Sequence, residues 1–344
     1  MNGMKRMKIN IVLSVISIII MCSCAIQNDM GQTLIKPTCS HNIQKDTSVS
    51  LRRVMCLEHS NGHLYVSDYD YGIYDFDSKF KVAKHYARKG HGHGEVLGCG
   101  FFFLQPDKSI WVVNEAGHSF EKYNEGNYVG RLLYPRGFMP TSCSRFFMVE
   151  DTVFHSVIND KEKLVYSFAN DTSVSKFCDF VPDIDDPDMP IKSSRHVLKT
   201  DEGFLLIGVA YPIVQTFSMT GDALAQYDLK QIPLIEETYV ANITDKPNSF
   251  FILVQDCYYK NGSIFLLVAT NGKQYSRNTL IELRLNGNSI ECKAIYKLKS
   301  NIYSTFCITD DNRCIAFNED ESVFEEYKID TQSSNSPQAF KKSE

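Results

Sequence analysis

Residues 51–87 read LRRVMCLEHSNGHLYVSDYDYGIYDFDSKFKVAKHYA and contain four short strand-like runs. The runs cover Leu51–Leu57, His63–Asp68, Gly72–Asp77 and Phe80–Ala87, and polar turn residues such as Asn61-Gly62 separate them. The whole chain of 344 residues holds 22 Phe and 18 Tyr against one Trp and 11 Pro, which suits a protein rich in β-strand. The opening stretch therefore predicts one four-stranded antiparallel sheet.

The same unit repeats along the chain, and its second strand is the easiest marker. The six marker strands are Leu64–Asp68, Ile110–Asn114, Thr152–Ser156, Phe204–Gly208, Ile264–Val268 and Cys314–Asn318. Their starts lie 42 to 60 residues apart, near the roughly 40 to 50 residues of a four-stranded propeller blade. The repeat predicts an all-β fold, a six-bladed β-propeller with four-stranded antiparallel blades.

The last unit lacks a fourth strand before Asp330. We expect the segment Gln32–Ile43, which contains Thr33-Leu34-Ile35, to supply the outer strand of the sixth blade and close the ring. Two β-sandwiches would also give many short strands, with a linker at Val181–Ser194. That segment joins units of one repeat, which favours the ring.

The N-terminus is typical of an export signal. Lys5, Arg6 and Lys8 precede an apolar run from Ile9 to Met21, which is shorter than the roughly 20 residues of a spanning helix. Met21-Cys22-Ser23-Cys24 resembles the lipobox of bacterial lipoproteins, and this resemblance implies that Cys24 carries the lipid. An uncleaved membrane helix is the alternative.

The chain is thus predicted to have four parts. These are a signal peptide (1–23), a lipid anchor with linker and closing strand (24–45), the propeller (46–330) and a polar tail (331–344). Removal of the signal changes the formal charge from −5 to about −8, because three basic residues leave with it. An acidic domain has no basic excess for a nucleic acid partner.

Nine cysteines remain after Cys22 and Cys24 are set aside, and most lie in apolar runs that favour buried thiols. One pair is a disulfide candidate. If Asp310-Asp311 is a two-residue hairpin turn, Cys307 and Cys314 lie directly opposite each other. No CxxC metal cluster is present in the sequence.

The segment Arg88-Lys89-Gly90-His91-Gly92-His93-Gly94-Glu95-Val96 resembles the G-x-G-P-G-E-F connector of NHL-like propellers, with His93 and Val96 in place of Pro and Phe. Together with Asn61–Asp68 it resembles the six-bladed, TolB-like propeller lipoproteins of Bacteroidetes. The resemblance covers the chain from the lipobox to about Asp330. It implies the fold and a cell-envelope location, and no catalytic signature.

Three groups of residues are candidate sites. The glycines of the connector could cradle an anion, and His91 and His93 could ligate a metal, although a structural connector with surface histidines is the simpler interpretation. Clustered carboxylates could hold calcium, but a solvated acidic loop is favoured. Tyr69 and Asp70 follow the first marker strand and could contribute to an aromatic platform or to blade packing. The acidic cluster comprises Asp183, Asp185, Asp186 and Asp188.

These features predict an outer-membrane lipoprotein, facing the periplasm or the cell surface, whose propeller binds a protein, peptide or glycan without catalysis and without a cofactor. The alternative is a metal-assisted propeller hydrolase or lyase that acts on a glycan or small ester. Its catalytic residues would converge from distant blades, so a local motif would not reveal them.

Overall fold

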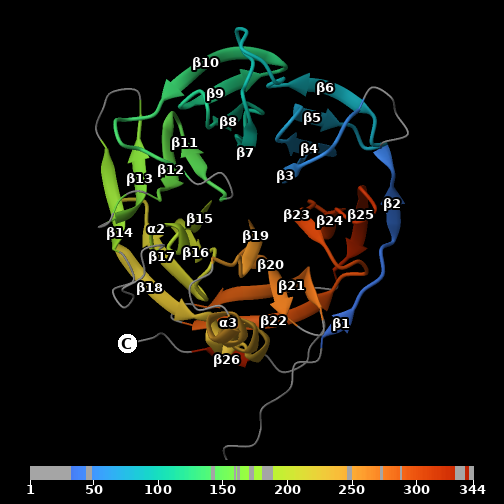
Figure 1. Ribbon diagram of the computed structural model, residues 1–344, viewed down its shortest axis with the longest axis vertical. Coiled ribbons are helices and arrows are strands. Elements are labelled where there is room, and N and C mark those ends of the chain that lie inside the picture. Colours follow the sequence, from blue (N-terminus) through green and yellow to red (C-terminus); the bar gives the residue numbers. More distant parts are fainter. Residues whose placement is uncertain are drawn as a thin grey trace, which may run out of the picture. The chain divides into compact units, whose positions relative to one another are not determined.

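The computed structural model describes residues 32–43, 49–140, 144–158, 160, 163–169, 174–179, 189–245, 250–271, 274–286, 289–329 and 338–340. Within this part of the chain, six antiparallel sheets follow one another around a ring (Figure 1). The fold is a six-bladed β-propeller. The predicted signal peptide, Cys24 and the four aspartates of the acidic cluster lie outside the described residues.

The first five blades take their strands in chain order from the centre of the ring to its rim, and the sixth takes its rim strand from the N-terminal segment. The first blade holds β3 (Val54–Ser60), β4 (His63–Asp68), β5 (Gly72–Phe76) and β6 (Val82–Tyr86), and the second holds β7 (Cys99–Leu104), β8 (Ile110–Asn114), β9 (Ser119–Asn124) and β10 (Asn127–Leu133). The third holds β11 (Phe147–Val149), β12 (Thr152–Ser156), β13 (Lys163–Phe168) and β14 (Ser175–Asp179), and the fourth holds β15 (Arg195–Lys199), β16 (Gly203–Gly208), β17 (Ile213–Ser218) and β18 (Ala223–Asp228). The fifth holds β19 (Val254–Lys260), β20 (Ser263–Asn271), β21 (Tyr275–Asn286) and β22 (Ser289–Lys297), and the sixth holds β23 (Tyr303–Ile308), β24 (Arg313–Asn318), β25 (Val323–Lys328) and β2 (Cys39–His41). The six predicted marker strands are confirmed as β4, β8, β12, β16, β20 and β24.

Neighbouring blades cover both faces of each sheet. For this reason β5 is buried at all five positions, whereas the rim strand β10 alternates between exposed and half-buried residues over most of its length. Apolar side chains from adjacent blades form shared cores. One core joins the fifth, sixth and first blades, and another joins the first, second and third.

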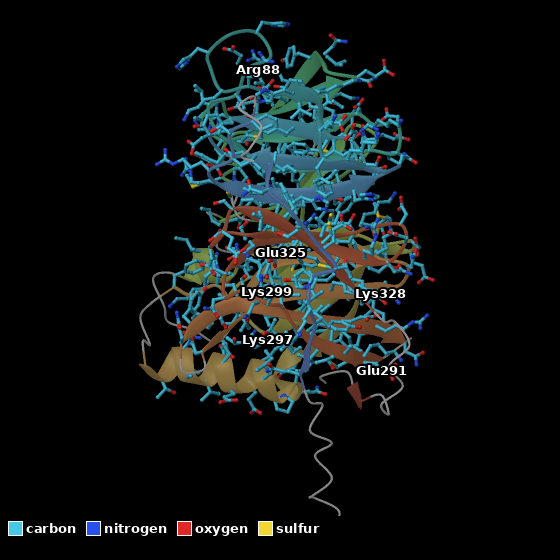
Figure 2. All side chains as sticks on the ribbon, turned by 90° about the vertical axis from the view of Figure 1, so that its right-hand side faces the viewer. Arg88, Glu291, Lys297, Lys299, Glu325 and Lys328 are labelled. Atoms are coloured by element: carbon cyan, nitrogen blue, oxygen red, sulfur yellow. The ribbon has the colours of Figure 1, made fainter. Side chains whose placement is uncertain are left out.

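The N-terminal segment closes the ring, as expected, through β2. Cys39–His41 pair antiparallel with β25, and the Thr38 amide donates to the Glu326 carbonyl at 2.7 Å. The His41 ring also stacks on Phe80 of the first blade, with centroids 3.7 Å apart. Figure 2 shows this blue segment running alongside the red strands of the sixth blade. Thr33–Leu34 instead form β1, which pairs in parallel with β22 of the fifth blade.

Elements outside the blades are few within the described residues. They are the 3-10 helix η2 (Leu229–Gln231), α2 (Met189–Lys192), α3 (Pro233–Asp245) and β26 (Gln338–Phe340). The helix α3, which the sequence did not predict, packs beside β20. The strand β26 lies within the predicted polar tail and pairs with β22. Across the described segments, every helix is too short or too polar to traverse a lipid bilayer.

The predicted register of the last hairpin is wrong by one residue. Cys314 lies opposite Ile308, and Cys307 lies opposite Ile315, because the turn holds three residues, Asp310 to Asn312, rather than two, and Thr309 and Arg313 pair across it. Both cysteines are buried free thiols. Burial raises the pKa of both thiols, which keeps them protonated. The Cys307–Cys314 disulfide is therefore not formed.

Candidate functional site

One face of the ring collects two kinds of loop. Because neighbouring strands run antiparallel, the turn between the second and third strands of a blade reaches the same face as the connector to the next blade. We call this the connector face. Four candidate residues from the sequence lie in such loops. Tyr69 and Asp70 belong to the turn between β4 and β5, and His91 and His93 belong to the connector between β6 and β7.

An apolar pocket of about 380 Å³ opens on the connector face of the second, third and fourth blades. Its volume falls within the range of small-molecule sites in proteins. Turns and connectors of all three blades supply the wall, which is formed by Glu115, His118, Tyr134, Phe138, Met139, Pro140, Ile158, Ile191, Ser194, Val209, Phe250 and Ile252. We call this cavity the connector pocket.

The rim of the connector pocket is apolar and exposed. Met139 is 53%, Ile191 44% and Phe250 41% exposed, although large apolar side chains are usually covered. These three side chains come from three different connectors, so no local sequence pattern brings them together. Their convergence on one cavity is typical of a binding surface.

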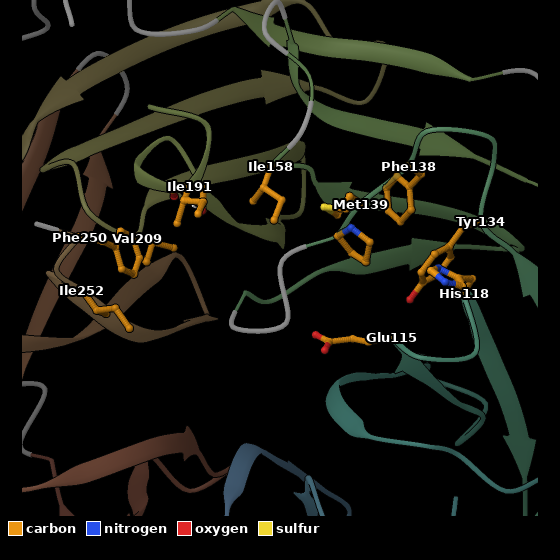
Figure 3. A pocket seen from close by; sticks show the side chains of 12 residues that line it. Glu115, His118, Tyr134, Phe138, Met139, Ile158, Ile191, Val209, Phe250 and Ile252 are labelled. Carbon is orange, nitrogen blue, oxygen red and sulfur yellow. Dashed lines mark hydrogen bonds between the residues drawn. The ribbon is translucent and has the colours of Figure 1, made fainter. Parts of the chain in front are cut away.

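Figure 3 shows the pocket wall divided into an apolar side and a more polar side. Ile191, Val209 and Phe250 lie on one side, and His118 and Tyr134 lie on the other. The carboxylate of Glu115 points toward the space between the two sides. Burial raises the pKa of the Glu115 carboxyl.

The innermost strands of the first, fifth and sixth blades meet at a buried ionic network around Arg145. The guanidinium donates from Nε and Nη2 to the two carboxylate oxygens of Asp256, at 2.6 and 3.0 Å, and from Nη1 to Glu58. Nη2 also donates to the Phe306 carbonyl at 3.1 Å. Thr305 donates its hydroxyl to Asp256 at 2.6 Å. Residues of the first, fifth and sixth blades thus meet on one arginine.

Electrostatics holds the guanidinium of this network in its charged form, whereas burial raises the pKa of Glu58. The side chain of Arg145 is 5% exposed and that of Asp256 is 0% exposed. Burial alone would lower the pKa of Arg145, but the charges of Asp256 and Glu58 outweigh it and keep the pKa well above its usual value. The guanidinium is buried and has partners from three blades, which indicates a structural role.

The glycine-rich connector binds a carboxylate of its own. The Gly92 amide donates to Glu95 Oε2 at 2.7 Å, and a Cβ atom at Gly90 would lie 2.0 Å from the same oxygen. These contacts with Glu95 fit the favoured interpretation of this segment as a structural connector. His93 packs edge-on against Tyr128, with ring centroids 4.6 Å apart. Among the described residues, no group of three His, Cys, Asp or Glu side chains is arranged to hold a metal ion.

Tyr69 and Asp70 bind Arg53 rather than forming an open platform. The Arg53 guanidinium lies 4.1 Å from the centroid of the Tyr69 ring and donates two hydrogen bonds to Asp70, at 2.8 and 2.9 Å. Lys89 donates to Asp70 as well, at 3.3 Å. The hydrogen bond from Arg53 lowers the pKa of Asp70 to about 2. These contacts fasten a turn of the first blade to the connector that follows it.

The fold and the connector pocket define this chain as a six-bladed β-propeller with an apolar cavity on its connector face. No protein-family model and no curated protein matches it. Several solved structures share the fold at low sequence identity. They are a streptogramin B lyase (9% identity, 85% of this chain and 97% of that chain, TM-score 0.53), a "Putative exported protein" from Bacteroides fragilis (11%, 86% and 99%, 0.56) and an inactive virginiamycin B lyase from Staphylococcus aureus with quinupristin (11%, 81% and 95%, 0.50).

Proposed function

We propose that this chain is a lipid-anchored protein of the cell envelope that binds a ligand in the connector pocket without transforming it. The observation that carries the proposal is the pocket itself, which joins a cavity of about 380 Å³ to an exposed apolar rim. Apolar walls with a few polar groups are the usual composition of a ligand site. A protein or peptide partner could reach the pocket by inserting one apolar side chain.

The proposal of an envelope location rests on the N-terminal sequence and on one similar structure. The lipobox-like segment ends at Cys24, and the similar Bacteroides fragilis protein is described as exported. We propose that the anchored domain sits at the outer membrane, facing the periplasm or the cell surface.

Loss of the anchor is expected to release the protein. Cys24→Ser removes the thiol that would carry the acyl chains, and each buried methylene of such a chain contributes roughly 0.8 kcal/mol to membrane binding. Fractionation of cells should find the variant in the soluble fraction and the original chain in the membrane fraction. Unchanged membrane retention of the variant would exclude lipidation at Cys24, while Cys22→Ser serves as the control for the neighbouring thiol.

Polar substitutions at the pocket rim are expected to weaken binding of an apolar probe. Ile191→Ser combined with Phe250→Ser should lower the affinity for Nile red by about tenfold, because burying such a side chain contributes roughly 1.5–3 kcal/mol when it is complete. Titration of Nile red fluorescence measures the change.

Leu224→Ser is the matched control for this experiment. Leu224 lies on the rim strand β18, is 51% exposed and does not line the connector pocket. The proposal predicts unchanged Nile red affinity for this variant. Equal losses in both variants would mean that the probe binds to apolar surface in general, and the connector pocket would lose its support as a binding site.

The alternative function, a metal-assisted hydrolase or lyase, makes a different prediction. A protein of that kind would retain a stoichiometric divalent metal on purification, which elemental analysis detects. The lyases that share the fold do so at 9–11% identity, and such a likeness extends to the fold alone.

A further inference from the structure

Two polar atoms in the wall of the connector pocket have no hydrogen-bond partner in the part of the chain that the structure describes. They are Glu115 Oε1 and the hydroxyl oxygen of Tyr134, and both are buried. Buried polar atoms in folded proteins nearly always have a partner, because an unmet one loses its hydration without compensation. Two such atoms in the same pocket indicate that a ligand supplies the hydrogen bonds that the described residues do not.

The two atoms lie close enough to interact electrostatically. Burial, followed by the charge of Glu115, raises the pKa of Tyr134. The ring of Tyr134 also meets His118 edge-on, with centroids 6.1 Å apart, and Phe138 at 5.0 Å. A carboxylate and aromatic rings therefore share one side of the connector pocket.

This combination favours a cation that carries hydrogen-bond donors. An ionised carboxylate only accepts hydrogen bonds, and a phenol oxygen can accept one, whereas an ammonium group has three donors and no acceptor. Aromatic faces attract cations as well. Among the described residues that line the pocket, Glu115 is the single carboxylate, and none is Lys or Arg.

The other side of the pocket selects the rest of the ligand. Ile158, Ile191, Val209, Phe250 and Ile252 offer no side-chain hydrogen-bonding group, so they favour an apolar body. Resting on the binding function proposed above, we propose that the ligand is an amphipathic amine. Its ammonium group binds Glu115 and Tyr134, and its hydrocarbon part fills the apolar side.

Calorimetric titration with two matched probes tests this inference. The probes are 4-phenylbutylamine and its uncharged counterpart 4-phenyl-1-butanol, which differ at the polar end. The intact chain should bind the amine about tenfold or more tightly than the alcohol, as expected for a hydrogen bond to a buried charge. Glu115→Gln, which keeps the shape and removes the charge, should abolish this preference and leave the alcohol affinity unchanged.

Two further variants separate recognition from folding. Glu125→Gln makes the same chemical change in the turn between β9 and β10, at an exposed side chain away from the pocket, and should keep the preference for the amine. Tyr134→Phe should reduce the preference partly, because it removes the hydroxyl and keeps the ring. Circular dichroism of each variant confirms that the fold is retained.

The outcomes distinguish this inference from the function on which it rests. Equal affinities of the intact chain for amine and alcohol, or a preference that survives Glu115→Gln, would overturn amine recognition while ligand binding in the pocket stands. Binding of Nile red with no binding of either probe would also overturn amine recognition while ligand binding in the pocket stands. If neither probe nor Nile red binds, the proposed function falls together with the inference.

Discussion

Arg145→Met is expected to lower the free energy of unfolding by about 3–5 kcal/mol, since it leaves the buried carboxylate of Asp256 and the half-buried carboxylate of Glu58 without their cation. Asp256 would keep its hydrogen bond from Thr305 but lose both bonds from the guanidinium. Glu58 would lose its bond from the guanidinium and keep the hydrogen bond that the Tyr258 hydroxyl donates at 2.8 Å. Urea denaturation followed by circular dichroism measures the difference.

Arg53→Met is the matched control for this prediction. It removes the same kind of two-pronged contact, from Arg53 to Asp70, but the Arg53 side chain is 53% exposed. Exposed ion pairs contribute little to stability. A destabilisation by Arg145→Met no larger than that by Arg53→Met would contradict the structural role assigned to the central network.

A chain that begins at Asn42 is expected to be far less stable than one that begins at Gln32. The shorter chain lacks β1 and β2, so it loses their hydrogen bonds to β22 and β25, the bond of His41 to Glu326 at 2.8 Å, and the stack of His41 on Phe80. Each net hydrogen bond contributes about 1 kcal/mol, which gives a loss of roughly 3 kcal/mol or more. Thermal unfolding monitored by circular dichroism shows the shift.

The shorter chain should also associate with itself. Removal of β2 leaves the edge of β25 unpaired, and unpaired strand edges recruit further strands. Size-exclusion chromatography should therefore show larger species for the chain that begins at Asn42 than for the chain that begins at Gln32. If both chains melt at the same temperature and remain the same size, β2 does not close the ring.

The repeat made the blades predictable, because each blade encodes its own strands locally. The helix α3 was missed for a physical reason. Its β-branched and aromatic residues favour strands, and its apolar residues form no clean stripe, since Ile235 is buried while Val240 and Ile243 are exposed. The proline at its first position, Pro233, was the available signal.

The candidate site was less predictable, because its residues come from loops of three blades. Nothing local marks Glu115 or Tyr134 as neighbours in one pocket. The central network left no clear trace either, because β19 reads Val-Gln-Asp-Cys-Tyr-Tyr-Lys and does not mark Asp256 as a buried charge. The glycine-rich connector was interpreted as a structural connector, with an anion site as the alternative, and its sequence does not show that Glu95 folds back onto it.

The closing strand also constrains the order in which the protein can fold. Residues 39–41 leave the ribosome early, yet the partner of His41, Glu326, lies 285 residues further along the chain. The first five blades can assemble from local pairings as they emerge, whereas the sixth stays incomplete until nearly the whole chain has been made. A nascent chain that stops short of β25 can therefore never complete the circle. We expect such products to be recognised by proteases rather than to persist as smaller rings.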